Sequence, residues 1–399
     1  MLEVITLDAA RRAVEEIVRG LEGSVSADAQ SPSGRIAAED VLSEVDVPSF
    51  DRSLVDGFAV KSFDTFGCSD ALPAVLRLTG EIMMGEDNER TISEGECMRI
   101  PTGGRLPAGA DCALMFEYTE EPGDGTVCVL KPCAPFENVM STGADIKRGQ
   151  LLFKRGHMFS AKDTGVLAAA GITAVAVRRR PVVCVISTGD ELVPASVKPK
   201  GSQVRDINTP LLSACVKEYG CDVYSGGIIK DDAGELLTAL KTALEKCDAV
   251  IVSGGSSVGQ RDALYDTLAL LGEVVFHGIA VKPGKPTMLA RVEGKPVLGL
   301  AGHPLAAFFM FKELAAPLLC GLSGTVRRES TVTARAARNI PSNHGREELI
   351  PVRLDNGIFE PLVSKSGAMC VLACAHGYIK IPRASEGVFE GEQKQVILF

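Results

Sequence analysis

Small residues and acids follow two apolar runs of the sequence. Ala249–Val252 has the composition of a buried strand and leads into the loop Ser253–Gly259 and then to Asp262. Val182–Ile186 is a second such run, followed by the segment Ser187–Glu191. Small side chains let a ligand approach the backbone, whose free N–H groups bind anions, and carboxylates hold Mg²⁺ on a phosphate. Together the two runs predict a ligand site at the carboxyl edge of a parallel sheet.

Acids and lysines elsewhere in the same region favour an anionic ligand. Four carboxylates follow predicted strands at short distance: Glu191, Asp206, Asp231 and Asp262. A single Asp at a strand end commonly caps a helix, but four acids converging on one edge favour a metal–phosphate or oxyanion site over caps alone. Two cations lie on a turn held by prolines, Lys282-Pro283-Gly284-Lys285-Pro286, which suits an anion or phosphate; the alternative is a solvated basic turn.

Known nucleotide and metal signatures do not account for these residues. The segment Gly284–Thr287 lacks the upstream glycine of a phosphate-binding loop and contains Pro286, and the sequence has no G-x-G-x-x-G after a strand and no H-E-x-x-H. Residues 255–259 do match G-x-S-x-G, so Ser257 is a candidate hydrolase nucleophile. Its partners would be Asp262 or Asp266, with His277 or His303. Because no HGGG-type oxyanion loop accompanies this match, serine hydrolysis is kept only as an alternative.

The composition bounds the partners and the compartment. Hydrophobic residues make up 46% and charged residues 23% of the chain, as in soluble globular proteins. A net charge of −9 and the absence of tryptophan argue against nucleic acid or acidic lipid as a partner. Twelve cysteines without a C-x-x-C pair indicate small buried side chains in a reducing cytosol. The N-terminus lacks a signal-peptide pattern, and the apolar stretches 166–177 and 297–311 are too short or interrupted to span a bilayer, which predicts a cytoplasmic protein without a membrane segment.

The pattern of predicted secondary structure, the texture of the sequence, changes at Arg178–Pro181. Before it, a helix capped by Thr6 is followed by short strands and turns rich in glycine and proline. After it, strands alternate with helices, which predicts an α/β layer with a mostly parallel sheet. Helices are expected near 210–219, 234–246, 262–271 and 306–319, and strands at 182–186, 222–229, 249–252, 274–280 and 296–300. The strand-like texture that returns near residue 325 predicts a small all-β tail.

Seven motifs, taken in order, point to one family. Near the N-terminus they are Asp51-Arg52-Ser53 with Val55–Val60, and Pro101-Thr102-Gly103 with Pro107–Asp111. The others are Ser187–Leu192, Asp206–Asn208, Ser253–Gly255 with Val258, Gly259 and Asp262, Lys282–Pro286, and Gly302–Pro304. Over nearly its whole length the chain resembles the molybdopterin molybdenumtransferase family, called MoeA in bacteria and the E domain of gephyrin in animals.

The resemblance implies an activity and an assembly. The reaction would be the Mg²⁺-dependent insertion of molybdate into the dithiolene of adenylylated molybdopterin, with release of AMP, in molybdenum cofactor biosynthesis. The active cleft of a homodimer would lie between the α/β domain of one subunit and the inserted domain of the other. The implied partners are the pterin substrate, a second copy of the chain and the molybdopterin adenylyltransferase.

The resemblance also implies a multidomain fold of the α/β plus β class. Its parts would be an N-terminal helix that packs with the α/β domain (1–23), an elongated β domain (24–46 and 140–177) and an inserted β-rich domain (47–139). An α/β molybdopterin-binding domain with a mostly parallel sheet (178–324) and a C-terminal β-barrel (325–399) would follow.

The same resemblance assigns roles to residues. The catalytic residues would be Asp56, Thr102, Asp231 and Asp262, and the metal ligands Glu191, Asp231 and Asp262. The substrate-binding residues would be Ser187, Thr188, Gly189, Asp206, Ser253, Gly254, Gly255, Ser256, Ser257, Gly259, Lys282, Lys285 and Pro304. The chain departs from the family pattern at Gly278, Ala301 and Pro351, all around the expected molybdate or pterin site. Two alternatives therefore stay open: an enzyme that uses tungstate, and a non-catalytic relative that binds or carries the pterin.

Overall fold

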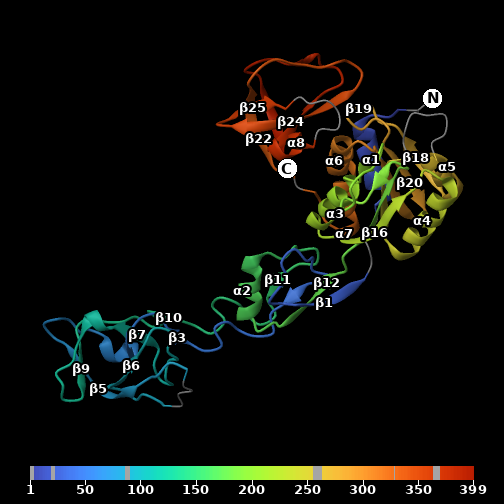
Figure 1. Ribbon diagram of the computed structural model, residues 1–399. Coiled ribbons are helices and arrows are strands. Elements are labelled where there is room, and N and C mark those ends of the chain that lie inside the picture. The colour runs from blue at the N-terminus through green and yellow to red at the C-terminus, as the bar shows by residue number, and fades with distance from the viewer. Residues whose placement is uncertain (1–3, 19–22, 86–89, 255–262, 328, 363–368) are drawn as a thin grey trace. The chain divides into compact units, whose positions relative to one another are not determined.

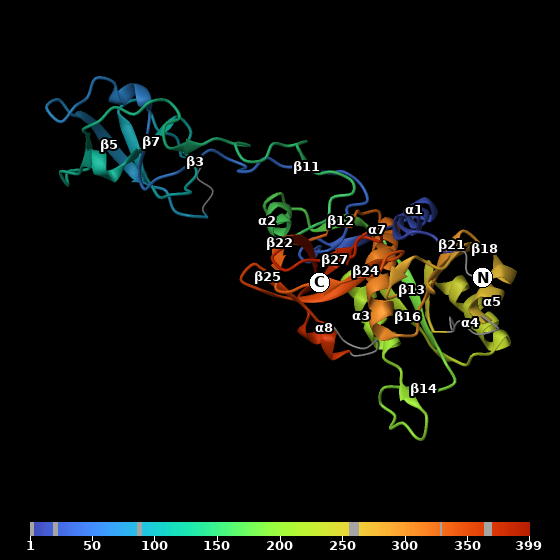
Figure 2. The same cartoon turned by 90° about the horizontal axis from the view of Figure 1, so that it is seen from above.

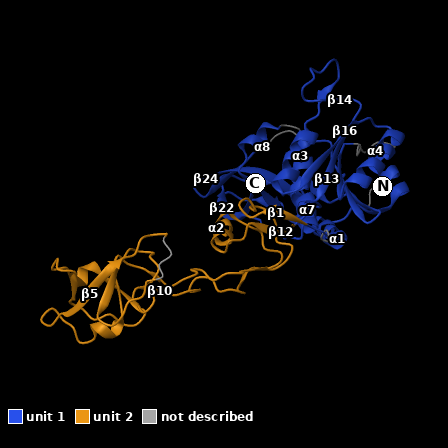
Figure 3. Cartoon of the chain, turned by 90° about the horizontal axis from the view of Figure 1, so that it is seen from below, with its two compact units in different colours: residues 1–24, 178–399 blue, residues 25–177 orange. Residues whose placement is uncertain are grey.

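The computed structural model describes residues 4–18, 23–85, 90–254, 263–327, 329–362 and 369–399. The chain forms two compact units, one made of Met1–Ser24 and Arg178–Phe399 and the other of Val25–Val177 (Figure 3). The division at residue 178 coincides with the change of texture in the sequence, where strands and turns give way to alternating strands and helices.

The Val25–Val177 unit contains a six-stranded sheet of order β7-β4-β6-β5-β9-β8. Its strands are β4 (Gly57–Val60), β5 (Ala74–Glu81), β6 (Glu96–Ile100), β7 (Cys112–Met115), β8 (Thr119–Glu120) and β9 (Thr126–Val129), with the short 3₁₀ helices η1 (Ser62–Thr65) and η2 (Phe116–Tyr118). Alternate residues of β4 serve two cores, since Phe58 and Val60 pack in one cluster and Ala59 in another.

The rest of this unit has a core of its own, in which Ala37, Phe153, Phe159 and Leu167 are buried. It is built from three two-stranded sheets and one helix. These are β1 (Ser24–Asp28) with β12 (Ala174–Arg178), β2 (Val41–Leu42) with β11 (Leu151–Phe153), β3 (Arg52–Ser53) with β10 (Val139–Met140), and α2 (Ala161–Ala169). The β-rich texture predicted from the sequence is therefore confirmed for this unit.

The other unit is organised around a six-stranded sheet of order β16-β13-β17-β21-β20-β18 (Figure 1). The strands are β13 (Val182–Thr188), β16 (Asp222–Ile229), β17 (Ala249–Ser253), β18 (Glu273–His277), β20 (Met288–Val292) and β21 (Lys295–Leu300). All six strands except β20 run in the same direction, because β20 is antiparallel to both of its neighbours, β21 and β18, so the predicted mostly parallel sheet is confirmed. Strand β20, which forms a hairpin with β21, was not among the predicted strands.

Helices cover both faces of this sheet. One face packs against α1 (Leu7–Ile17), α3 (Asn208–Glu218), α6 (Pro304–Met310) and α7 (Ala316–Ser323), and the other against α4 (Ala233–Lys246) and α5 (Ala263–Leu271). Val183 and Val185 of β13 belong to the first core and Cys184 and Ile186 to the second, as the two-residue period of a strand requires. A ribbon of β14 (Leu192–Val193) and β15 (Val204–Arg205) extends away from the sheet (Figure 2).

The helix that follows β21 is unusually apolar. It runs from Pro304 to Ser323 and includes a π-helical turn, η3 (Phe311–Ala315). In length and composition it could cross a membrane, which corrects the expectation that no stretch was long enough, but 89% of its most apolar window is buried inside the protein. Burial on this scale is typical of a core helix.

The C-terminal residues form a closed β-barrel, as expected. Its strands are β22 (Thr331–Ala336), β24 (Glu347–Asp355), β25 (Ile358–Pro361), β26 (Gly377–Ile381) and β28 (Gln393–Leu398), and β24 closes the ring by pairing with both β25 and β26. Strand β19 (Val281–Lys282) adds to β24, and β23 (Ile340–Pro341) pairs with β27 (Gly387–Val388). The expected all-β tail also contains a short helix, α8 (Cys370–Cys374).

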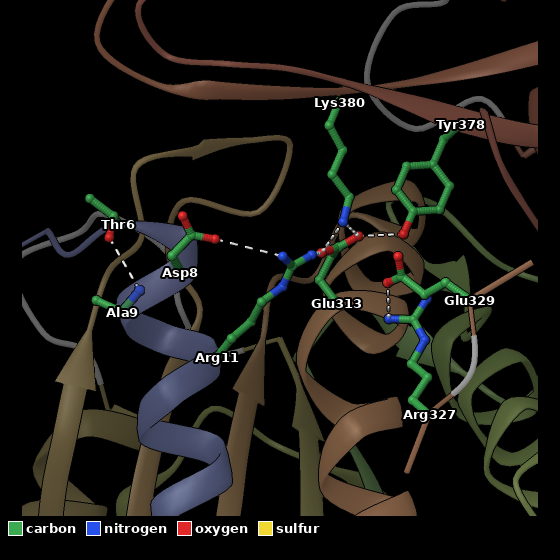
Figure 4. Close-up of polar contacts among 9 residues, drawn as sticks. All are labelled: Thr6, Asp8, Ala9, Arg11, Glu313, Arg327, Glu329, Tyr378 and Lys380. Atoms are coloured by element: carbon green, nitrogen blue, oxygen red, sulfur yellow. Dashed lines mark hydrogen bonds and ion pairs between the residues drawn. The ribbon is translucent and has the colours of Figure 1, made fainter. Parts of the chain in front are cut away.

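A buried carboxylate joins the two ends of the chain to the α/β layer (Figure 4). Glu313 lies on the π-helical turn with a fully buried side chain, and it pairs with Arg11 of α1. Two residues of β26 also contact it: Lys380, whose Nζ lies 3.1 Å away, and Tyr378, whose hydroxyl donates to the carboxylate. Because a lone buried charge is costly, these three donors are required partners of Glu313.

Candidate functional site

The parallel strands end in one row at the carboxyl edge of the sheet. Ser187 of β13 lies opposite Ser253 of β17, which lies opposite Leu300 of β21. At the β16 side, Thr188 lies opposite Ile229. Residues that follow these strands are therefore neighbours, as the prediction of a site at this edge requires.

The first polar cluster at this edge contains two residues expected to bind substrate. Ser187 Oγ donates to Asp206 Oδ1 at 2.9 Å and lies 2.8 Å from the hydroxyl of Thr209. The backbone N–H of Thr209 also donates to Asp206 Oδ1, at 3.1 Å. Both described bonds of the nearly buried Asp206 fall on one oxygen, so its second oxygen, Oδ2, can accept a hydrogen bond from a ligand.

The second polar cluster is built around Asn208, which was not among the expected site residues. Its Nδ2 donates to Ser253 Oγ at 2.7 Å and to the Gly302 carbonyl at 2.8 Å, and Ser253 Oγ donates to the Ala301 carbonyl at 3.3 Å. The buried Oδ1 of Asn208 has no hydrogen-bond partner among the described residues. A buried acceptor without a partner is costly in a folded protein, so an N–H donor of a ligand would be stabilised there.

A glycine lets two backbone segments of this edge approach one another. Gly254 has φ +103°, and a Cβ at this position would lie 2.3 Å from the Thr188 carbonyl oxygen. A side chain at Gly254 would therefore push the ends of β13 and β17 apart. A Cβ on Gly189 would lie 2.8 Å from the carboxylate of Glu191, which is the end of a side chain and not backbone.

A pocket of ≈ 660 Å³ opens beside β13 and β16. Its lining residues are Gly189, Asp190, Leu192, Pro194, Ala195, Asp206, Thr209, Pro210, Gly227, Ile228 and Lys230. Of the expected substrate-binding residues, Gly189 and Asp206 line it. Lys230, its basic lining residue, was missed, although the sequence places it directly before the predicted Asp231.

Three acids crowd the same side of the edge. Burial, followed by the negative charges of Asp190 and Glu191, raises the pKa of Asp231. A divalent cation bound beside these acids would relieve this mutual repulsion. Asp262 lies outside the described residues, and among those described no three His, Cys, Asp or Glu side chains are already arranged around a common point. The expected ligand set of Glu191, Asp231 and Asp262 stays a prediction.

Part of the predicted anion loop is likewise outside the described residues. This applies to Gly255, Ser256, Ser257, Gly259 and Asp262, and hence to the candidate hydrolase nucleophile. The described start of the loop, Ser253–Gly254, lies at the sheet edge beside Thr188.

The basic turn reaches the same edge from the antiparallel side of the sheet. Met288 lies opposite both Gly299 and His277, so the connection between β18 and β20, residues 278–287, lies at the end where β21 finishes. Lys285 of this turn is exposed, and Lys282 pairs with Glu348 of β24, Nζ to Oε1 2.5 Å. Neither lysine lines the 660 Å³ pocket.

Pro304, also expected to bind substrate, begins α6 directly after β21. A proline in the first turn of a helix leaves no N–H unsatisfied there. Its position follows the Gly302 carbonyl that Asn208 contacts, so Pro304 fixes where the chain turns at this edge.

The remaining expected residues, Asp56 and Thr102, belong to the Val25–Val177 unit. The backbone N–H of Thr102 donates to Asp56 Oδ1 at 2.7 Å. The turn that contains Thr102 is also bonded to Ser53. The Ser53 carbonyl accepts from the Gly103 N–H at 2.7 Å, and the Ser53 N–H donates to the Gly104 carbonyl at 2.9 Å. Two motifs that are far apart in the sequence therefore form one surface.

Comparison with known proteins covers nearly the whole chain. The family described as "MoeA N-terminal region (domain I and II)" matches residues 5–171, "Probable molybdopterin binding domain" matches 184–320, and "MoeA C-terminal region (domain IV)" matches 333–399. The molybdopterin molybdenumtransferase of Staphylococcus aureus (strain COL) is 31% identical over 389 residues, 91% of this chain and 88% of that protein.

A solved structure agrees with these matches. The molybdopterin biosynthesis MoeA protein of Pyrococcus horikosii is 37% identical, covers 99% of both chains and superposes with a TM-score of 0.90. Sequence, domain order and fold thus agree from one end of the chain to the other. The chain belongs to the MoeA family.

Proposed function

We propose that this chain, a transferase of molybdenum cofactor biosynthesis, inserts molybdate into adenylylated molybdopterin with Mg²⁺ and releases AMP. The observation that carries the proposal is the carboxyl edge of the α/β sheet, where a 660 Å³ pocket adjoins buried polar groups and three crowded acids. A volume of this size is typical of sites for small organic molecules. The curated relative named molybdopterin molybdenumtransferase spans 91% of the chain, which supports the same activity.

The pocket offers acceptors and apolar walls that suit a pterin. The free oxygen of Asp206, which lines the pocket, could accept from the ring N–H groups of a pterin. Leu192, Ile228 and Pro210 line the pocket with apolar surface for a flat ring. Lys230 places a cation on the same wall, where it could contact a phosphate.

Release of AMP requires that charge be stabilised as a phosphoanhydride breaks. Mg²⁺, held by Glu191, Asp231 and Asp262 directly or through water, would supply the positive charge on the phosphates. The backbone N–H groups of the Ser253–Gly259 loop, with Lys282 and Lys285, would donate to the oxygens on which negative charge develops. Such donors favour the reaction most when they are fixed in advance.

The assembly we propose is a homodimer in which Asp56 and Thr102 of one subunit serve the α/β edge of the other. The fixed turn around them supports this role, because catalytic groups act best when the backbone that carries them is held in place. The four-domain division given above, a cytoplasmic location and an interaction with the molybdopterin adenylyltransferase belong to the same proposal.

Reconstitution of a molybdenum enzyme tests this function. The purified chain, adenylylated molybdopterin, molybdate and Mg²⁺ should together activate a cofactor-free molybdenum enzyme, whereas omitting the chain should leave it inactive at micromolar molybdate. Activation that is equally fast without the chain would contradict the proposal.

A further inference from the structure

The basic turn at the sheet edge is paired with a buried carboxylate of the β-barrel. Lys282 Nζ lies 2.5 Å from Glu348 Oε1, and the two side chains differ sharply in exposure: 57% for Lys282 and 6% for Glu348. The carboxylate is therefore enclosed by protein while most of the lysine remains open to solvent. An exposed pair would contribute little, but a buried carboxylate needs its partner.

The backbone fixes this pair from both sides. Lys282 lies opposite Glu348 in the parallel pairing of β19 with β24, and the N–H of Glu347 donates to the Ala280 carbonyl at 2.9 Å. On its other side β24 pairs with β26, where Glu348 lies opposite Ile381. Glu348 therefore stands in the middle of three bonded strands, and its carboxylate has little freedom to follow the lysine elsewhere.

Docking of the barrel does not by itself explain a buried acid at this position. Leu349, Tyr378 and Ile397 of the barrel already belong to the apolar core of the α/β layer. The buried Glu313 links the same two parts through Tyr378 and Lys380. A further buried carboxylate adds a desolvation cost that an apolar side chain would avoid. Its presence therefore indicates that the position of the Lys282 ammonium has to be fixed.

The location of Lys282 explains why its ammonium would have to be fixed. The turn that carries Lys282 lies at the edge where β21 ends, the edge that holds Ser253 and Gly302. An ammonium group has three N–H donors, and Glu348 Oε1 takes one of them. The other two remain for an anion on the exposed side, and the contact with the enclosed Glu348 carboxylate restricts where the ammonium at the end of the Lys282 side chain lies.

We propose that Glu348 is a positioning residue of the transfer reaction, which holds the Lys282 ammonium at the sheet edge for an anionic group of the pterin substrate. The inference rests on the proposed function. It means that the β-barrel contributes a residue, Glu348, to the site. Glu348 touches no substrate and acts only through Lys282.

A double-mutant cycle tests this relationship. Glu348→Gln keeps the size and an acceptor but removes the charge, and Lys282→Met removes the ammonium. We expect Glu348→Gln to raise the Kd for adenylylated molybdopterin about tenfold and to lower kcat/KM by at least the same factor. In the Lys282→Met background the same change should have no further effect. An unchanged Kd in Glu348→Gln, or equal effects in both backgrounds, would overturn the proposal.

A matched control is an exposed ion pair between β24 and the neighbouring strand β25. Arg353 of β24 pairs with Glu360 of β25 at 2.6 Å, and both side chains are exposed. Glu360→Gln makes the same chemical change in the same barrel and should leave Kd and KM unaltered. Thermal unfolding of all variants separates a loss of folded protein from a loss of binding.

Failure of the proposed function can be told apart from failure of this inference. The Kd is measured by titrating the pterin without molybdate, so the cycle gives a result even if no AMP is released. The rate at which an amine-reactive acetylating reagent modifies Lys282, followed by peptide mass spectrometry, should rise in Glu348→Gln because the amine is no longer engaged. Faster modification with an unchanged Kd would mean that the pair exists but does not serve the substrate, which would refute the inference.

Discussion

The backbone N–H of Thr102 lies 2.7 Å from Oδ1 of Asp56, although the two residues are 46 positions apart in the sequence. The carboxylate thereby fixes the turn that begins at Pro101, and its other oxygen, Oδ2, faces no described partner. The surface formed by these two residues is exposed, so its construction is not explained by core packing.

Removal of the Asp56 carboxylate should abolish turnover and leave the fold intact. In Asp56→Ala the exposed turn loses one hydrogen bond, which costs about 1 kcal/mol of stability. Steady-state AMP release and thermal unfolding measure the two effects. Asp124→Ala is the control, because Asp124 accepts from the Thr126 backbone N–H at 3.0 Å in a turn of the same unit. Full activity in Asp56→Ala would remove this residue from the site.

Asp231 should be essential while its neighbour is not. Asp231→Ala removes an expected metal ligand and should lower kcat to background. Asp232 caps α4 by accepting from the N–H groups of Gly234 and Glu235, so Asp232→Ala should cost about 1 kcal/mol of stability and keep its turnover. The same AMP-release assay compares the two variants. Equal activity in both would place the chemistry elsewhere.

Magnesium binding should weaken as the pH falls. Burial and the charges of Asp190 and Glu191 raise the pKa of Asp231, so its carboxylate takes up a proton at a higher pH than an ordinary aspartate. Since only the ionised carboxylate binds a metal, protons compete with Mg²⁺ in this range. The Mg²⁺ concentration for half-maximal activity, titrated from pH 7 downward, should rise, and chelation should abolish turnover reversibly. A requirement that does not change with pH would exclude Asp231 as a ligand.

Loss of the buried Glu313 carboxylate should destabilise the chain severely. Glu313→Ala leaves Arg11 and Lys380 without their acid, and breaking a buried pair in this way costs about 3–5 kcal/mol. Urea unfolding measures the loss. Glu273 pairs with Arg291 on the surface, and Glu273→Ala should change stability little. Similar losses of unfolding free energy in the two variants would show that the buried network stabilises the chain no more than an exposed ion pair does.

Much of the fold could be predicted because its patterns are local. The run at 222–229 was predicted with the bounds the structure has, and the change of texture at Arg178 separates the two compact units. The hairpin of β20 and β21 was missed although the sequence carried a signal, a glycine at position 294 between two apolar runs. In the structure Glu293 and Gly294 both have positive φ, as a two-residue hairpin turn requires.

Other features have no local signal. The partner of Lys282 is 66 positions away, and only the pairing of β19 with β24 brings the two together. The π-helical turn that presents Glu313 interrupts an apolar helix whose sequence reads as ordinary core. The role of Asn208, at the start of α3, depends on Ser253 at the end of β17 and on Gly302 just after β21, both of which are far from it in the sequence. Long-range geometry of this kind follows from tertiary packing and not from periodicity.

AMP release from adenylylated molybdopterin is the measurement that tests the central claim most directly. The purified chain is incubated with the pterin and Mg²⁺, with molybdate, with tungstate or without oxyanion, and AMP is quantified over time. We predict release that depends on an oxyanion, with the faster of the two oxyanions identifying the metal that the site accepts. Tight pterin binding without any AMP release would contradict the account and would make the chain a binding protein.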